Sequence, residues 1–473
     1  MNYELFTIFA AMKKIFTLLL CLVGMQLSAT AQDKNRVVFP EGKCYLYRIT
    51  LKDKKGSTAS LRHPEQFLSQ KAIERRRRQG LKVDESDLPV SEVYLRELAA
   101  QHVQVVSKSK WNNTVLVKTA TPQQAESLKS LAFVNDVVQT FSAPDSVTLS
   151  VRDSLKTIRA EDDTLYSTSY GRAKLQVEML GGIKLHEAGF RGNGMTIAII
   201  DGGFMNVDQI PAFRKVNIIS AKDFGFPQSD IYQEGDHGTC VLSLMAANEY
   251  GAIIGTAPEA SYLLLRSEVG AYENLCEEDF WVAAAEYADS IGVDVINTSL
   301  GYNHFDNADN NHHYADLDGH STVISRAASL LADKGIVLVN SAGNSGNNQW
   351  KKITPPADAE NVLTVGALRL NGTNANFSSV GPSQDGRVKP DIMAPGNPDW
   401  VIGGDGRLST GSGTSFASPL ACGMVACLWQ SLPTKTAKQI IDIVLNSCNQ
   451  YDTPDNIFGY GTPDFYKAYI DNR

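Results

Sequence analysis

Apolar runs of strand length alternate with helical stretches between residues 176 and 430, and this alternation constrains the fold more than any other feature. The expected strands are residues 196–200, 262–266, 293–297, 336–340 and 362–365. Helical patterns cover residues 176–188, 237–248, 277–290, 321–334 and 415–430. Such alternation predicts a parallel sheet with helices on both of its faces.

Three polar motifs stand where such a sheet places its ligands. Asp201 follows the first strand, in TIAIIDGGF, and open α/β sheets bind ligands at the carboxyl ends of their strands. A buried aspartate requires a partner, and His237 of GDHGTC, at the start of a helix, is the expected one. Ser415 lies in GTSFASP, at the mouth of the last long helix. Aspartate, histidine and serine together form the set that nucleophilic acyl transfer requires.

Each of these residues alone has a structural interpretation. A lone histidine at a helix start is usually a helix-end residue, and a serine in the position of Ser415 is usually an N-cap. The chain order Asp–His–Ser favours the catalytic interpretation. So do the glycines and small residues around Ser415, which permit close approach of a peptide backbone.

With these motifs in this order, residues 173–467 resemble the subtilase family of subtilisin-like serine peptidases. The resemblance implies a subtilisin-like domain in which Ser415 attacks a peptide carbonyl. His237 would accept the proton of the serine, and Asp201 would hold the imidazole. Asn344, in NSAGNSG, matches the asparagine that donates to the oxyanion in this family, with the backbone N–H of Ser415 as the second donor.

The resemblance also implies how a substrate is held. A peptide would bind as an added extended strand through main-chain hydrogen bonds. Two segments would form the walls of the pocket for the residue before the scissile bond, namely Ser299, Leu300 and Gly301 on one side and Ser341, Ala342 and Gly343 on the other.

Two positions depart from the family pattern. Tyr302 follows the first wall, where the family often has glycine, and is expected to narrow the neighbouring subsites. Cys240 stands three residues after His237, where the family commonly has a second histidine. Because Ser415 and Asn344 are both present, a small buried residue beneath the histidine is favoured over a thiol nucleophile.

Residues 32–145 have the pattern of a separate small α/β module. Strands are expected over 43–51, 103–107, 114–119 and 134–140, and helices over 64–80, 91–101 and 122–131. Apart from the first helix, this is the β-α-β-β-α-β order of ferredoxin-like modules. In position and pattern the module resembles the inhibitory propeptide of subtilases.

The first helix of this module carries four consecutive arginines, Arg75, Arg76, Arg77 and Arg78. Four adjacent residues spread around a helix, so a solvated surface is expected for all of them. Residues 146–172 are polar and aperiodic and predict an exposed linker. Residues 173–473 then remain as the peptidase domain.

The first 31 residues predict an export signal. Two lysines after Met12, the expected start, precede an apolar run over residues 15–23, and Ala-Thr-Ala at 29–31 supplies a cleavage site. The protein is therefore expected to begin at Gln32 and to be secreted or placed in the cell envelope. No later stretch is long and apolar enough to suggest a membrane span.

Composition and spacing argue against several other functions. The net charge of −8 disfavours nucleic acid as a partner. Seven cysteines, one of them in the signal, show no zinc-type spacing, and no cofactor is expected. The inserted segment 303–320 carries four aspartates that calcium could use as oxygen ligands, Asp306, Asp309, Asp316 and Asp318. It lacks the spacing of an EF-hand loop, so a solvated loop is favoured.

The sequence therefore predicts an exported serine endopeptidase that acts on proteins or peptides, with its own propeptide as an intramolecular inhibitor. Two alternatives stay open: an inactive subtilase kept as a binding or scaffold protein, and an esterase or amidase of narrow specificity. Side-chain preference, disulfide pairing and oligomeric state are not predicted.

Overall fold

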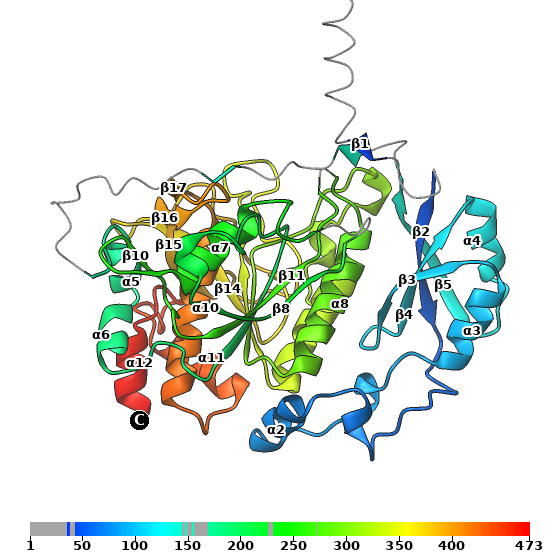
Figure 1. Cartoon of the computed structure of the whole chain (residues 1–473), viewed down its shortest axis with the longest axis horizontal. Helices are drawn as coiled ribbons and strands as arrows, with labels where there is room; N and C mark the ends of the chain where they lie inside the picture. Colours follow the sequence, from blue (N-terminus) through cyan, green and yellow to red (C-terminus); the bar gives the residue numbers. More distant parts are fainter. Residues whose placement is uncertain are drawn as a thin grey trace, which may run out of the picture.

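The computed structural model describes residues 36–37, 43–143, 147–148, 154–155, 169–225, 230–270 and 272–473. The expected export signal and most of the expected linker lie outside these ranges. The described part forms a small N-terminal module and a larger domain, with helix α8 (Cys276–Ile291) between their two sheets (Figure 1). Across the described helices, none has the length and apolar character that a membrane crossing requires.

The larger domain is built on a seven-stranded sheet in the order β15-β14-β13-β12-β7-β11-β8. Every neighbouring pair is parallel, which confirms the predicted sheet. Its strands are β7 (Thr196–Asp201), β8 (Asn217–Asp223), β11 (Ser261–Arg266), β12 (Val295–Thr298), β13 (Val337–Ser341), β14 (Leu363–Arg369) and β15 (Ile392–Asn397).

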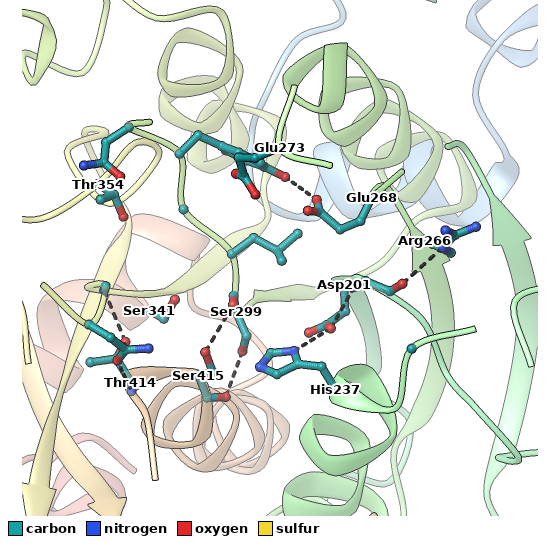
Figure 2. Close-up of a pocket in the computed structure, with 18 of the residues that line it drawn as sticks. Asp201, His237, Arg266, Glu268, Glu273, Ser299, Ser341, Thr354, Thr414 and Ser415 are labelled. Carbon is teal, nitrogen blue, oxygen red and sulfur yellow. Dashed lines mark hydrogen bonds and ion pairs between the residues drawn. The ribbon is translucent and has the colours of Figure 1, made fainter. Parts of the chain in front are cut away.

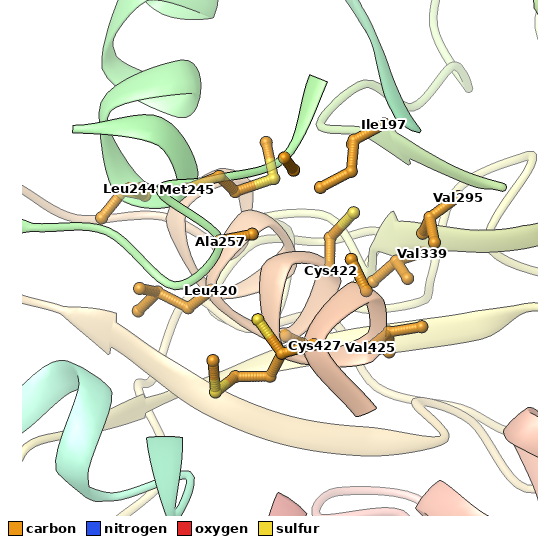
Figure 3. Close-up of a cluster of buried hydrophobic side chains, with 14 of the residues drawn as sticks. Ile197, Leu244, Met245, Ala257, Val295, Val339, Leu420, Cys422, Val425 and Cys427 are labelled. Atoms are coloured by element: carbon orange, nitrogen blue, oxygen red, sulfur yellow. The ribbon is translucent and has the colours of Figure 1, made fainter. Parts of the chain in front are cut away.

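Helices cover both faces of this sheet, as predicted. Ile197 and Ile199 of β7 belong to one core and Ala198 and Ile200 to the other, so alternate residues serve opposite faces. The first core packs against α7 (His237–Ala246) and α10 (Thr414–Ser431), and the second against α8 and α9 (Val323–Leu330). Figure 3 shows the first core, in which α10 is buried among side chains from several strands.

The remaining elements of the larger domain are short or peripheral. They are α5 (Lys174–Glu178), α6 (Gly182–Glu187), β9 (Asn248–Glu249), β10 (Ile253–Ile254), β16 (Asp399–Ile402), β17 (Leu408–Gly411), α11 (Ala437–Asn446) and α12 (Phe465–Asn472). The helix predicted over 176–188 is thus two helices. The chain breaks at Gly181, whose φ of 71° lies in the left-handed region that an α-helix excludes.

The order of the strands places the end of β7 at a special position. From β7 the chain runs outward to β8, returns to β11 beside β7, and then crosses to β12 on the other side of β7. Such a reversal of strand order opens a crevice at the carboxyl edge of the sheet. Asp201, the last residue of β7, therefore stands at this crevice.

The N-terminal module is a four-stranded antiparallel sheet in the order β3-β4-β2-β5. Its strands are β2 (Tyr45–Leu51), β3 (Gln104–Ser109), β4 (Thr114–Thr119) and β5 (Val134–Ser142), and its helices include α3 (Glu92–Ala100) and α4 (Pro122–Leu128). This confirms the predicted ferredoxin-like module. One face of the sheet packs on α8, where Leu46, Leu116 and Phe141 contact a cluster that includes Phe280.

A segment outside this motif reaches under the larger domain. Residues 64–81, here called the arm, contain a short 3₁₀ turn and α2 (Gln70–Arg78), which lies near the lower end of α8 (Figure 1). The prediction that all four arginines are solvated was wrong. Arg75 and Arg76 are 0% and 1% exposed, because that side of α2 faces acceptors on the larger domain, whereas Arg77 and Arg78 are exposed.

Candidate active site

Asp201 and His237 form a hydrogen-bonded pair at the carboxyl end of β7. Nδ1 of His237, the first residue of α7, lies 2.7 Å from Oδ1 of Asp201, which also accepts the N–H of Gly202 at 2.8 Å. The aspartate is fully buried, whereas the histidine side chain is 40% exposed. Loss of solvent lowers the pKa of His237, but the carboxylate of Asp201 outweighs this effect and raises that pKa above its ordinary value. Because Nδ1 is bound to Asp201, Nε2 of His237 is the ring nitrogen that remains available to groups in the cleft.

Ser415 lies at the N-terminal end of α10, beside His237 (Figure 2). Its Oγ donates to the carbonyl oxygen of Ser299 at 3.3 Å, and Oγ of Ser299 donates to the carbonyl oxygen of Ser415 at 2.9 Å. The two serines therefore hold the expected nucleophile against the first expected wall of the pocket.

Asn344 is oriented by the residue before Ser415. Its Oδ1 accepts hydrogen bonds from the backbone N–H and the hydroxyl of Thr414, at 2.9 and 3.0 Å. This leaves Nδ2 as the donor end of the side chain. A Cβ atom at Gly413 would lie 3.6 Å from the backbone N of Ser415 and 3.7 Å from Nδ2 of Asn344, so both nitrogens border the space beside this glycine.

A cavity of about 630 Å³ collects nearly all the site residues expected from the sequence. It is lined by Asp201, His237, Ser299, Leu300, Gly301, Ser341, Gly343, Asn344 and Ser415. Ala342 is the exception, because its side chain is buried behind the second wall in a cluster with Leu317, Ile353 and Ala357. Thr354, which the sequence did not assign, also lines the cavity, and its Oγ1 would lie 3.1 Å from a Cβ atom at Gly343.

Carboxylates that the sequence did not single out line the end of the cavity beyond the first wall. Tyr302 is buried there, and its hydroxyl donates to Glu268, the second residue after β11. Glu273 lies in the same part of the cavity (Figure 2). Burial raises the pKa of Glu273 to about 8, and the neighbouring carboxylates of Glu268 and Asp306 add to this rise.

Arg266, which also lines the cavity, forms ion pairs with two other carboxylates. Arg266 contacts the carboxylates of Asp223 at 2.8 Å and Glu234 at 2.7 Å. With Arg266 engaged by these two carboxylates, this end of the cavity gains negative charge as pH rises through the pKa of Glu273, about 8. Glu268, like Asp201, stands at the carboxyl end of a strand, so the sequence signal that indicated Asp201 could also have indicated Glu268.

Two of the four aspartates of the inserted segment accept hydrogen bonds from nearby backbone N–H groups. Asp316 accepts the N–H of His313, and Asp318 accepts those of His320 and Ser321. Calcium binding by this segment stays a prediction.

Within the described ranges, one cluster of three glutamates has the spacing that a metal ion could use. Glu268, Glu273 and Glu277 place oxygens within 4.8 Å of one another. The two oxygens of Glu277 already accept the N–H groups of Val269 and Asn274, so this side chain holds the loop together.

Cys240 lies one helical turn after His237 and packs against the first core. Burial raises the pKa of its thiol to about 12, and the carboxylates of Asp236 and Asp201 contribute. A thiolate is therefore strongly disfavoured at neutral pH, which argues against a role as nucleophile. Cys240, Cys276, Cys422, Cys427 and Cys448 are free thiols.

Comparisons with known proteins agree with this geometry. Residues 192–461 match the model of the subtilase family, and residues 46–156 match a peptidase S8 propeptide domain of Bacteroidota. Serine protease AprX of Bacillus subtilis is 30% identical over 300 residues, which cover 57% of this chain and 65% of AprX. Subtilisin DY of Bacillus licheniformis is 28% identical over 263 residues, which cover 54% of this chain and 84% of the relative.

Among solved structures, the epidermin leader peptide processing serine protease EpiP of Staphylococcus aureus has a similar fold. The TM-score is 0.64 at 19% identity, and the match covers 91% of this chain and 99% of that one. The match extends over both the N-terminal module and the larger domain.

Proposed function

Because this chain belongs to the subtilase family, we propose that it is a serine endopeptidase that cleaves proteins or peptides through Asp201, His237 and Ser415. The observation that carries this proposal is that the Asp201–His237 pair, Ser415 and Asn344 line one cavity at the strand-order reversal of the sheet.

In the proposed reaction, Oγ of Ser415 attacks the scissile carbonyl carbon while Nε2 of His237 accepts the hydroxyl proton. Oγ must first exchange the carbonyl oxygen of Ser299 for Nε2, and such contacts commonly tighten only when substrate binds. The bond to the leaving amine then breaks as His237 returns the proton to its nitrogen. Water hydrolyses the resulting acyl-enzyme by the same proton transfers.

The developing oxyanion would accept hydrogen bonds from Nδ2 of Asn344 and the N–H of Ser415. Replacing Asn344 with alanine should therefore lower kcat by about 10²–10³, the magnitude that this change has in subtilisin, with little effect on KM. Steady-state kinetics on a peptide substrate measure this. Asn347→Ala, an exposed asparagine in the same loop, is the matched control and should leave kcat unchanged. A loss below threefold for Asn344→Ala would remove this residue from the oxyanion role.

We further propose that the chain is exported and that it cuts itself between Ser142 and Arg172. The N-terminal module would hold this segment near the cleft, where tethering gives it a high effective concentration. Until the cut is made, the module would act as the inhibitor of its own catalytic domain. The match to a propeptide domain supports this proposal.

A fluorophosphonate label on the mature protein, followed by peptide mapping, tests the main proposal. The label should attach to Ser415, and the labelled preparation should lose the ability to hydrolyse casein. Labelling without any peptide hydrolysis would favour the esterase or amidase alternative. Absence of both would favour the scaffold alternative.

The acidic end of the cavity suggests the substrate class. It continues the wall expected to hold the residue before the scissile bond, so we propose a preference for lysine or arginine on that side of the cut. At about pH 9, above the pKa of Glu273, the change Glu273→Gln should lower about tenfold the ratio of kcat/KM for an arginine-containing peptide to that for its methionine counterpart. Because the pKa of Glu273 is about 8, the preference of the unmodified enzyme should grow as pH rises through that value.

Paired peptide kinetics measure this ratio. Glu249→Gln, an exposed carboxylate outside the cavity, is the control and should leave the ratio unchanged. An equal ratio for Glu273→Gln and the unmodified enzyme would contradict the assignment.

A further inference from the structure

The contact between Asp201 and His237 joins two segments that lie far apart in the chain. Asp201 ends β7, and His237 begins α7, 36 positions later. Residues 202–205 are here called the aspartate loop, and residues 230–236, which precede α7, are called the histidine loop. A displacement of about 1 Å at a reacting group can cost about 10²-fold in rate. The two loops must therefore keep a fixed relative position if Asp201 and His237 are to act together.

The backbones of the two loops lie against each other. The N–H of Met205 donates to the carbonyl oxygen of Gly235 at 2.9 Å. A Cβ atom at Gly203 would lie 1.9 Å from the carbonyl oxygen of Glu234, so no residue other than glycine fits at this position. This backbone contact fixes how close the aspartate loop and the histidine loop come to each other.

Arg266 reaches both loops with one side chain. It ends β11 and stands opposite Asp201 in the parallel pair of β11 and β7. Its Nε donates to the carbonyl oxygen of Gly202 at 3.1 Å (Figure 2). Its Nη2 lies 2.7 Å from Oε2 of Glu234. One guanidinium therefore contacts the residue after Asp201 and a residue three positions before His237.

A third contact attaches this guanidinium to the sheet. Nη1 of Arg266 lies 2.8 Å from Oδ2 of Asp223, the last residue of β8. The side chain of Arg266 is 2% exposed. Each of its three nitrogens thus has an acceptor, and hydrogen bonds between charged groups are the strong ones in proteins. Because Asp223 belongs to neither loop, it holds the arginine to the scaffold from which both loops extend.

The backbone next to Arg266 continues the attachment. The N–H of Ser267 donates to the carbonyl oxygen of Asp201 at 3.2 Å. The end of β11 therefore holds the backbone of Asp201 as well as the histidine loop. Although Arg266 lines the cavity, two carboxylates already neutralise its charge, so recognition of an anionic substrate group does not explain its position.

We propose that Arg266 is a positioning residue for the reaction: by binding Gly202 and Glu234 from the end of β11, it sets the distance between Asp201 and His237. Arg266 does not contact the reacting atoms and acts through the two loops. Without its guanidinium, Asp201 and His237 would both be present, but the histidine loop would lose its ion pair with the sheet. The inference rests on the proposed function in taking Asp201 and His237 to act together.

The kinetic test compares Arg266→Met and Arg266→Lys, with a peptide substrate that lacks lysine and arginine so that the acidic end of the cavity does not affect the result. Arg266→Met should lower kcat about 10²-fold with little change in KM, because the loss is one of geometry at the reacting groups. Arg266→Lys keeps the charge, but a single ammonium lacks the planar fork that contacts three acceptors. It should therefore lower kcat by an intermediate factor of about ten.

Loss of a buried cation also destabilises the fold, and Lys389→Met is the matched control for this effect. Lys389 is 2% exposed and lies 2.6 Å from Asp391, outside the cavity. This variant should have a lower thermal midpoint but an unchanged kcat. If Arg266→Met does not fold, Glu234→Ala provides the same test, because it removes one of the three contacts and leaves Arg266 paired with Asp223. Its kcat should fall about tenfold.

Proton NMR gives a readout that does not require activity. In full-length Ser415→Ala protein, the proton between Nδ1 of His237 and Asp201 should give a low-field resonance, whose position reports the strength of that hydrogen bond. Adding Arg266→Met should move this resonance toward that of an ordinary imidazole N–H, whereas adding Lys389→Met should not.

Three results would overturn the proposal. One is a kcat of Arg266→Met within threefold of that of the unsubstituted enzyme. Another is an unchanged resonance in folded Arg266→Met protein. The third is an Arg266→Lys enzyme as active as the unsubstituted one, which would show that charge alone is needed. An unsubstituted protein that hydrolyses no peptide would contradict the proposed function instead, and the resonance would still decide whether Arg266 positions the pair.

Discussion

Replacing Ser415 with alanine is expected to abolish fluorophosphonate labelling, peptide hydrolysis and cleavage of the chain's own linker together. The change removes the only atom that forms the covalent bond in the proposed reaction. The expected loss in kcat is about 10⁶-fold, the magnitude that removing the nucleophile has in subtilisin. Mass spectrometry of the purified protein would show a single chain that begins near Gln32, whereas the unsubstituted protein would yield a fragment that starts between Ser142 and Arg172.

The matched control is Ser431→Ala, at the other end of the same helix, which should label, hydrolyse and process like the unsubstituted protein. Two results would contradict the assignment. One is a Ser415→Ala chain that still processes itself at the same position. The other is an unsubstituted chain that is fully active while residues 32–141 are still covalently attached, which would make the module an accessory domain.

Replacing Asp201 with asparagine should lower kcat/KM by about 10⁴-fold while preserving the fold. The amide keeps the shape of the carboxylate, but it removes the charge that holds the correct imidazole tautomer at 2.7 Å. The effect should therefore appear in kcat far more than in KM. Circular dichroism and the thermal midpoint of the variant would show that the loss is not caused by unfolding.

The pH dependence of the residual activity gives a second and independent result. The proposed base must be neutral, so activity is present above the pKa of His237 and is lost as pH falls through it. Asp201 raises that pKa, so the acid limb of the unsubstituted enzyme should lie above the ordinary histidine value of 6.5. In Asp201→Asn the limb should move to lower pH. Asp236→Asn, which removes a more weakly acting charge, should move it less in the same direction. An acid limb at the same pH in all three proteins would show that Asp201 does not raise the pKa of His237.

The central strands of the larger sheet could be predicted because burial on both faces imposes an unbroken apolar run. β7, β11 and β13 are buried at nearly every position, and their runs are visible in the sequence. β8 was not predicted because it is an edge strand with exposed and half-buried positions and therefore has no apolar run. β15 was not predicted because its sequence, IMAPGN, contains proline and glycine, which normally indicate a loop.

The site residues could be predicted because the chemistry demands particular side chains at strand ends and helix starts. The side chain of Ala342 does not line the cavity, since neighbouring residues of an extended segment face opposite sides and this one belongs to the cluster behind the wall. Substrate binding by the wall segment stays a prediction. Glu273 was missed because a loop carboxylate has no pattern of its own. The burial of Arg75 and Arg76 was missed because a helix pattern describes one element and says nothing about the acceptors on another domain.

The crossed exchange of buried charges between the module and the larger domain limits how such proteins can be recombined. Arg76 and Lys334 come from different parts of the chain, yet both contact Asp87, and Asp289 in turn contacts two arginines of the arm. A module transplanted from a relative would bring its own charges to this contact, and a single mismatch would leave an ion without a partner. The module and the larger domain must therefore be transferred together in a chimera, even though the peptide bond that joins them is needed only until the linker is cut.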